Sequence, residues 1–320
     1  MALQDSSLSL QTASSVNAIY GINRLPSELL IEIFKFQPWD DGYGYHLSDS
    51  TKGPWILAAV CRQWRQLVIG EPRLWGTLSM LFGVSHNPPV DIFLSYAQHT
   101  PLSFHVTLWE ESTMPAGAMH SICQHAEAVG IENLTIWTLH PVTGYDHPKF
   151  RFLHHTQKLK TLNLFMAVRD NQNLSEFLVP FQHCPMLRQV FMNMGFCSGA
   201  SPTMGPTSFP WMQLTTLSLI VSIMSMPLVV SILRLSRNLE CFSLHGSEDE
   251  DYGANEYEEN LENAGEQEPI ALIHLRDLDI QMPTRLLSLL HCPALQSLHT
   301  EWVHIDDHTA FVEKYAAGPR

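Results

Sequence analysis

Basic residues are scarce in this sequence, which has 18 Lys and Arg against 32 Asp and Glu and a formal net charge of -14. Proteins that bind nucleic acids neutralise phosphates with clustered Lys and Arg, so this balance argues against a nucleic-acid partner. Cysteine is also sparse, because six residues are scattered along the chain without a C-x-x-C pair. This usage predicts reduced, buried thiols, typical of a cytoplasmic or nuclear protein, rather than a disulfide framework.

The sequence also lacks the signatures of common cofactor and metal sites. There is no GxxxxGK phosphate loop, and the histidines and cysteines form no grouping of convergent metal ligands. Residues 195–199 have the G-x-C-x-G spacing of a nucleophile elbow around Cys197, but the Gly and Pro residues that follow argue against the helix that such an elbow requires. We therefore expect no cofactor, no metal and no enzymatic activity. Catalysis by Cys197 is the alternative that these residues favour least.

Targeting and membrane segments are not evident either. Residues 1–20 have no basic start and no long apolar run, so we expect a disordered leader there rather than a secretory signal. From Gln189 to Ile232 the sequence has no charged residue, and residues 214–233 are apolar enough to imitate a membrane span. Ser, Thr and Pro interrupt this stretch, so we predict a strand followed by a helix that starts at Pro227, and no membrane association.

The stretch from Leu25 to Trp75 carries two amphipathic helical signals and a short tail. Pro26 suits the first position of a helix, and Glu28 is favoured in the first turn by the helix dipole. Apolar residues then follow at helical spacing, and a second such series runs from Pro54 to Val68. A unit this short cannot bury both apolar faces internally, so some apolar surface must face another body.

This stretch resembles an F-box of the kind found in fungal proteins. The resemblance is carried by Leu25-Pro26, Glu28-Leu29-Leu30, Ile33-Phe34, Val60-Cys61-Arg62, Trp64-Arg65 and Pro72-Arg73-Leu74-Trp75. It implies a three-helix module over residues 21–80 that docks on a Skp-family adaptor and, through it, on a cullin–RING ubiquitin ligase. The link at residues 37–53 is longer than in the usual F-box. By the same resemblance, the adaptor-binding residues are Leu25, Pro26, Leu29, Leu30, Ile33, Phe34, Val60 and Trp64. The alternative is an ordinary helical hairpin at the start of a globular domain.

An L-x-x-L-x-L pattern recurs in the rest of the chain. Complete or frayed copies start at Ile131, Leu159, Leu187, Leu214, Leu239, Leu275 and Leu295, and Pro101/Phe104/Val106 is a degenerate copy. Most intervals between copies fall in the range of leucine-rich repeats. Alternating apolar residues point to one side of a short strand, and helical stretches at residues 174–181, 228–235 and 284–290 would cover the other side.

Two His-Cys-Pro segments, at residues 183–185 and 291–293, come shortly before strands. They resemble the helix-to-strand corner of leucine-rich repeats in F-box proteins. We therefore predict an α/β fold in which residues 81–320 form an irregular leucine-rich-repeat solenoid, a horseshoe of strands and helices. A generic α/β domain with chance leucines is the alternative.

An acidic segment, residues 247–269, separates two of the copies. It contains ten acidic residues and no basic one. Such a composition cannot form a core, so we expect a disordered loop. The alternative is a docking segment for a basic partner, tuned by phosphorylation of Ser247.

The strand residues that flank the last two apolar positions of each copy point away from the core. Stacked strands would place these residues in rows on the concave side, where solenoids present an extended binding surface. We predict that a protein substrate binds there, at aromatic residues in the first half and, through its basic groups, at acidic residues in the second: Trp137, Phe165, Phe191, Asp279 and Glu301. A register shift of one residue would instead bury the aromatic side chains as core.

These predictions combine into one functional hypothesis. The chain would be the substrate-recognition subunit of a Skp–cullin–F-box ubiquitin ligase, with the adaptor bound by the F-box and a protein substrate by the repeat domain. The alternative is a non-catalytic interaction scaffold that has no part in ubiquitin transfer.

Overall fold

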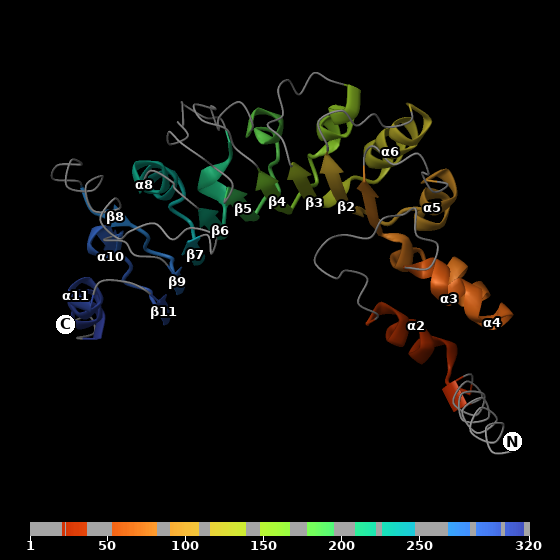
Figure 1. The fold of residues 1–320 in the computed structure, drawn as a ribbon, viewed down its shortest axis with the longest axis horizontal. Helices are drawn as coiled ribbons and strands as arrows, with labels where there is room; N and C mark the ends of the chain where they lie inside the picture. The colour runs from red at the N-terminus through yellow and green to blue at the C-terminus, as the bar shows by residue number, and fades with distance from the viewer. Residues whose placement is uncertain are drawn as a thin grey trace, which may run out of the picture.

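The chain folds as a mixed α/β protein, in which N-terminal helices are followed by one large parallel sheet (Figure 1). The computed structural model describes residues 21–22, 24–36, 53–81, 90–108, 116–138, 148–166, 178–194, 209–221, 226–246, 268–281, 286–301 and 305–316. The leader at residues 1–20 and almost all of the acidic segment lie outside these ranges, so their predicted disorder stays a prediction.

The N-terminal helices are α2 (Ser27–Lys35), α3 (Pro54–Val60) and α4 (Arg62–Gly70), followed by the short 3-10 helix η1 (Pro72–Trp75). Pro26 occupies the N-cap position of α2, and Glu28 lies in its first turn. The helical signal that continues from Pro54 to Val68 is divided at Cys61, whose backbone is extended, with φ -157° and ψ 173°. The Cys61 Sγ accepts a hydrogen bond from the Trp64 N–H at 3.5 Å, so this residue ends α3 and caps α4.

Trp75 joins these helices to the sheet. Its side chain is fully buried, and its Nε1–H donates to the Val68 carbonyl oxygen at 2.8 Å. The rings of Trp55 in α3 and of Phe93 and Tyr96 in α5 (Val90–Ala97) pack around it, at centroid distances of 4.8, 5.3 and 4.7 Å. Because aromatic pairs stabilise a core beyond the burial of their area, this cluster fixes the helices against the first helix that covers the sheet.

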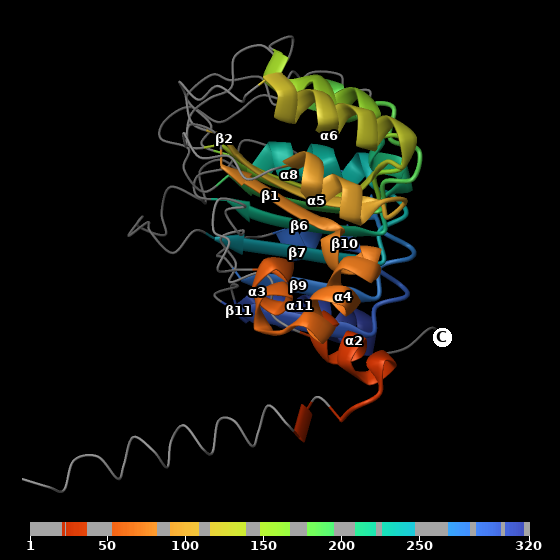
Figure 2. The same cartoon turned by 90° about the vertical axis from the view of Figure 1, so that its right-hand side faces the viewer.

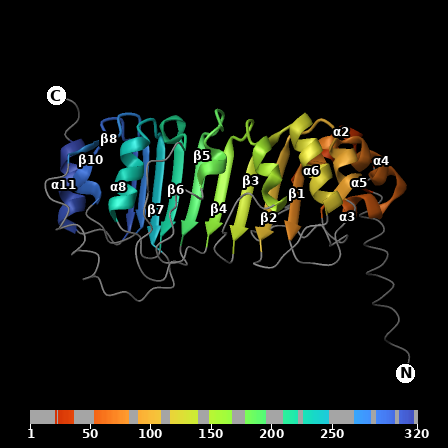
Figure 3. The same ribbon diagram turned by 90° about the horizontal axis from the view of Figure 1, so that it is seen from above.

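The large sheet has nine strands, all paired in parallel and arranged in chain order (Figures 1 and 3). They are β1 (Thr77–Leu81), β2 (Leu102–Leu108), β3 (Ile131–Thr138), β4 (Thr161–Met166), β5 (Gln189–Met194), β6 (Thr216–Val221), β7 (Cys241–Gly246), β9 (Asp277–Gln281) and β11 (Ser297–Glu301). A separate pair consists of β8 (Ile270–Ala271) and β10 (Leu290–His291). The first strand begins at Thr77, so the sheet starts inside the range of residues 21–80 that the sequence assigned to the helical module.

The helices that follow the module lie on the outer side of the curved sheet (Figures 1 and 2). Besides α5 they are α6 (Ala116–Ala128), η2 (Pro148–His155), η3 (Val179–Phe181), η4 (Trp211–Gln213), α8 (Met226–Leu235), α10 (Leu286–Leu289) and α11 (Ile305–Ala316). The helix predicted at residues 228–235 is found within α8, and β6 precedes it as expected. The one predicted at 284–290 is shorter, because Leu290 already belongs to β10. The helix predicted at 174–181 lies partly outside the described residues and ends in the 3-10 turn η3.

The recurring apolar residues form the core between the sheet and the helices. In β3 to β7 and in β9, all residues of the L-x-x-L-x-L copies are buried. The frayed last copy differs, because Leu295 and Leu298 are only partly buried at the end of the sheet. Burial alternates along β4, β5 and β6, so the apolar residues face the helices and the residues between them face the opposite, open side. Contrary to the prediction, the helices thus cover the apolar side of the strands and not the other side, because the apolar faces of strands and helices bury each other.

A repeated turn leads into the strands. The N–H of the first leucine of a copy donates to the carbonyl oxygen three residues earlier, at 3.0 to 3.3 Å, in Leu159, Leu187, Leu214, Leu239, Leu275 and Leu295. The N–H of the following residue then donates to the carbonyl oxygen of the equivalent residue in the preceding copy, as from Lys160 to Glu132 at 2.8 Å and from Arg188 to Lys160 at 2.9 Å. These two bonds fix the residue at which each strand begins to pair.

Gly130, directly before β3, provides a test of this packing. Its φ is +106°, and a Cβ there would lie 2.6 Å from Lys158 Cδ. Because L-residues rarely adopt that backbone conformation, Gly130→Ala should lower the free energy of unfolding by about 1–3 kcal/mol in urea titrations. Gly117→Ala in α6 is the control, since a Cβ there meets nothing within 4 Å. It should leave stability unchanged or raise it by up to about 1 kcal/mol. Equal losses from both substitutions would contradict this account.

Candidate functional site

Half of the predicted adaptor-binding residues present their side chains on the surface of the N-terminal helices. Leu29 and Ile33 on α2 and Val60 on α3 have exposed fractions of 51%, 44% and 47%. Pro26, at the start of α2, is exposed as well. These positions are available to a partner in the conformation described.

The other four predicted residues are buried or partly buried. Leu30 and Phe34 are completely enclosed, and the Phe34 ring packs on Trp64 with a centroid distance of 4.7 Å. Leu25 and Trp64 are partly buried against the core. Leu30 and Phe34 therefore belong to the core that holds α2 in place.

Two further apolar residues are exposed in the same helices. Phe36, directly after α2, has an exposed fraction of 84%, and Ile56 on α3 has 42%. Phe36 follows Leu29 and Ile33 at helical spacing, so the three lie on one side of α2, and the spacing from Leu29 could have identified it from the sequence. We call Leu29, Ile33, Phe36, Ile56 and Val60 the apolar surface of α2 and α3. Leu29, Ile33 and Phe36, exposed on one side of a helix, are apolar residues of the kind found at interaction sites.

The predicted aromatic residues form a continuous ladder across three neighbouring strands. Trp137 on β3 pairs with Phe165 on β4, and their rings stack at a centroid distance of 3.7 Å and an interplanar angle of 4°. Phe165 and Phe191 on β5 are 5.0 Å apart at 43°. All three are half-buried on the open side of the sheet. The strand register is thus the expected one, and the shift by one residue that would bury these rings as core does not occur.

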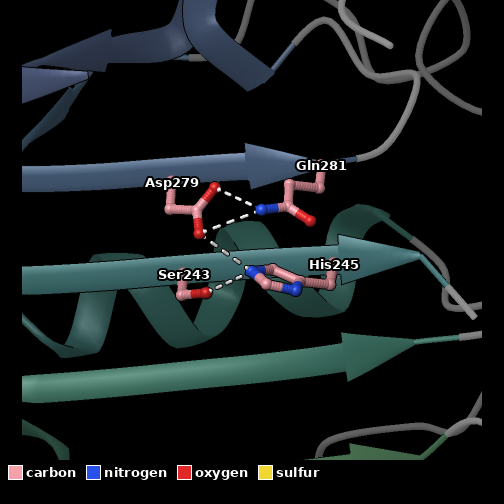
Figure 4. A network of polar contacts seen from close by, with 4 residues as sticks. All are labelled: Ser243, His245, Asp279 and Gln281. Atoms are coloured by element: carbon pink, nitrogen blue, oxygen red, sulfur yellow. Dashed lines mark hydrogen bonds and ion pairs between the residues drawn. The ribbon is translucent and has the colours of Figure 1, made fainter. Parts of the chain in front are cut away.

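A polar network occupies the open side further along the sheet (Figure 4). His245 Nε2 on β7 lies 2.7 Å from Ser243 Oγ and 3.1 Å from Asp279 Oδ2 on β9. Gln281 Nε2 donates to both carboxylate oxygens of Asp279, at 3.1 and 3.3 Å. A catalytic Ser-His-Asp triad uses one ring nitrogen for the hydroxyl and the other for the carboxylate. Here the same nitrogen faces both groups, so the network orients Asp279 and is not arranged as a triad.

The two halves of the predicted substrate site are not in contact with each other. Asp279 is half-buried on β9, and Glu301 is exposed on the last strand, β11. Strands β6 and β7 lie between them and the aromatic ladder. A ligand that touches both groups must therefore be extended across the strands.

The described part of the chain contains neither a cluster of metal ligands nor a membrane-spanning helix. No group of three or more His, Cys, Asp or Glu residues within it could hold a metal ion. Cys197 of the G-x-C-x-G segment lies outside the described residues. None of the helices described is both long and apolar enough to cross a bilayer.

The described cysteines are free thiols in two different environments. Cys184 and Cys292 are buried as expected, whereas Cys61, Cys123 and Cys241 are only half-buried. Burial raises the pKa of the Cys292 thiol to about 12. Burial also raises the pKa of Cys184, whose Sγ–H donates to Thr156 Oγ1 at 3.4 Å.

Comparison with known families identifies one region of the chain. Residues 22–80 match the family model of F-box-like domains. The matched range contains α2 to η1, all eight predicted adaptor-binding residues and most of β1. A comparison with curated proteins finds no match.

Thiol labelling can test the burial of the corner cysteine Cys292. Because the thiolate is the reactive form, a pKa of about 12 leaves only about one thiol in 10⁴ ionised at pH 8. N-ethylmaleimide should therefore label Cys61 in the folded protein well before Cys292, as read by peptide mass spectrometry. In denaturant both should react at similar rates. Equal rates in the folded protein would show that Cys292 is not enclosed as described.

Proposed function

From the F-box-like domain at residues 22–80, we propose that this chain is the substrate-recognition subunit of a Skp–cullin–F-box ubiquitin ligase. The observation that carries the proposal is the exposed apolar surface of α2 and α3, which lies within the matched range. Leu29, Ile33 and Val60 would contact a Skp-family adaptor directly. The adaptor would connect the chain to the cullin and its RING partner.

The sheet domain, in this proposal, is an irregular leucine-rich-repeat solenoid of the fungal F-box type. Its strands pair in chain order, and a similar turn precedes each of the last six copies of the leucine pattern. Repeats of this kind stack because one repeat cannot bury its own apolar face. The expected curvature would place the open side of the sheet on the concave surface.

The substrate would bind to that open side. Trp137, Phe165 and Phe191 offer large half-buried rings, the type of side chain that dominates binding energy in protein interfaces. Asp279 and Glu301 would supply charge at the other end of the site. The chain itself would perform no chemistry, because ubiquitin transfer would belong to the other ligase subunits. We place this activity in the cytoplasm or the nucleus, in keeping with the free thiols.

Substitutions on α2 test adaptor binding. Leu29→Ser combined with Ile33→Ser should weaken capture of a purified Skp-family adaptor by tenfold or more, because removal of central anchors costs about 2 kcal/mol or more. Both residues are exposed, so circular dichroism and the unfolding midpoint should stay unchanged. Binding would be measured by titration calorimetry on the full chain.

Ile92→Ser is the matched control for this experiment. Ile92 is an Ile on helix α5 with an exposed fraction of 45%, and it lies outside residues 22–80. Its substitution should leave adaptor affinity unaltered. If the α2 variant binds the adaptor as tightly as the parent chain, these residues are not the anchors; if the parent chain fails to bind any Skp-family adaptor, the ligase role itself is wrong.

A further inference from the structure

The strand residues on the open side of the sheet include carboxylates but no Lys or Arg. Strand pairing aligns its outward residues in three rows, which run from Thr77 to Ser297, from Ser79 to His299 and from Leu81 to Glu301. None of the residues in these rows is a Lys or an Arg. The carboxylates in them are those of Asp277, Asp279 and Glu301, all on β9 and β11. The surface is therefore neutral and aromatic at β3 to β5 and acidic at its other end.

Among the described residues, basic side chains occur at the corners before the strands and not in the rows. Lys160 forms an ion pair with Glu132. Arg188 directs its Nη1 to the carbonyl oxygens of Pro185 and Leu187, at 3.2 and 2.9 Å. Arg276 directly precedes Asp277, whereas neither Asp279 nor Glu301 has a Lys or Arg next to it in the sequence.

Asp279 is held in a fixed orientation. The Gln281 amide contacts both of its carboxylate oxygens, and His245 contacts one (Figure 4). A carboxylate has about four lone-pair sites, so acceptor capacity remains for a charged donor from outside. A preoriented acceptor loses less conformational entropy on binding than a free side chain does.

The distance between the aromatic and the acidic ends sets the length of a ligand. Phe191, Ser218, Ser243 and Asp279 are consecutive members of one row. Three steps between strands span about 14 Å, which an extended chain covers with about four residues. The two residues between the ends are serines, whose small side chains leave space for a peptide backbone.

We propose that this face recognises an extended segment of a partner protein that carries a large apolar side chain and, about four residues away, an Arg or Lys. The apolar side chain packs on Trp137, Phe165 and Phe191, and the cation binds Asp279 and Glu301. The inference rests on the proposed binding role of this face. It names the class of substrate as a basic one, in accord with the net charge of -14, which attracts cationic partners over distance.

Selection from a random peptide library displayed on phage, with the full chain as the immobilised target, tests this inference. The enriched peptides should share an aromatic or large aliphatic residue and a basic residue at that spacing. An enriched peptide is then synthesised with Gln in place of its basic residue. This replacement should weaken its affinity for the chain by about tenfold or more, because a charge-assisted hydrogen bond is lost. This substitution lies in the peptide, so it does not depend on the folding of a variant protein.

Protein variants show which residues of the sheet recognise each half of the peptide motif. Asp279→Asn with Glu301→Gln should remove the preference for the basic residue and keep that for the apolar one. Phe165→Ser with Phe191→Ser should do the reverse. Glu240→Gln, which removes an exposed carboxylate at a corner, is the matched control and should change neither preference.

Several results would overturn the inference: no enriched peptide, a motif without a basic residue, or a motif unaltered by the Asp279 and Glu301 substitutions. Adaptor capture by the same protein preparation is measured in parallel. A chain that captures the adaptor but selects no basic motif would contradict the substrate class and leave the ligase role intact. A chain that selects the basic motif without capturing the adaptor would support the ligand and contradict the ligase role.

Discussion

The hydrogen bond that closes each corner, from a leucine N–H to the carbonyl oxygen three residues earlier, is the interaction on which the sheet depends. It sets the residue at which a strand starts to pair, so the side chains of successive strands stay in phase. A slip of one residue would exchange the two faces of a strand, which would move Leu162 and Leu164 out of the core and Phe165 into it. The buried leucines, the open rows and the aromatic ladder all follow from this repeated local geometry.

Local patterns explain why much of the sheet could be predicted from the sequence. The L-x-x-L-x-L copies and the alternation along a strand are short-range features, and they placed Trp137 beside Phe165 correctly. The helical module was harder, because apolar spacing continues through Cys61 although its backbone is extended there. An amphipathic face also does not reveal which of its residues a neighbouring helix will cover. Leu30 and Phe34 are enclosed while Leu29 and Ile33 are exposed, and this depends on where the helices of the module pack.

Two surfaces of different chemistry are carried by one connected core. The apolar surface of α2 and α3 lies at one end, and the open side of the sheet extends away from it (Figure 1). Trp75, with Trp55 on one side and Phe93 on the other, links the helices to the sheet through buried rings. Close packing of this type holds the helices and the sheet in a fixed relative position. A ligand on the sheet would therefore be presented at a defined orientation to whatever binds the helices.

The edge of the sheet opposite the corners tolerates changes in chain length better than the corners do. At the corners, a fixed turn is followed by a backbone hydrogen bond to the preceding copy, so an extra residue there would disturb the pairing of the strand. After the carboxyl ends of the strands the connections differ widely, from residues 222–225 after β6 to residues 247–269 after β7. Lengthening such a connection costs little closure entropy. Insertions during evolution could therefore accumulate along the edge nearest His245 and Glu301 and change the border of the open side while the scaffold stays the same.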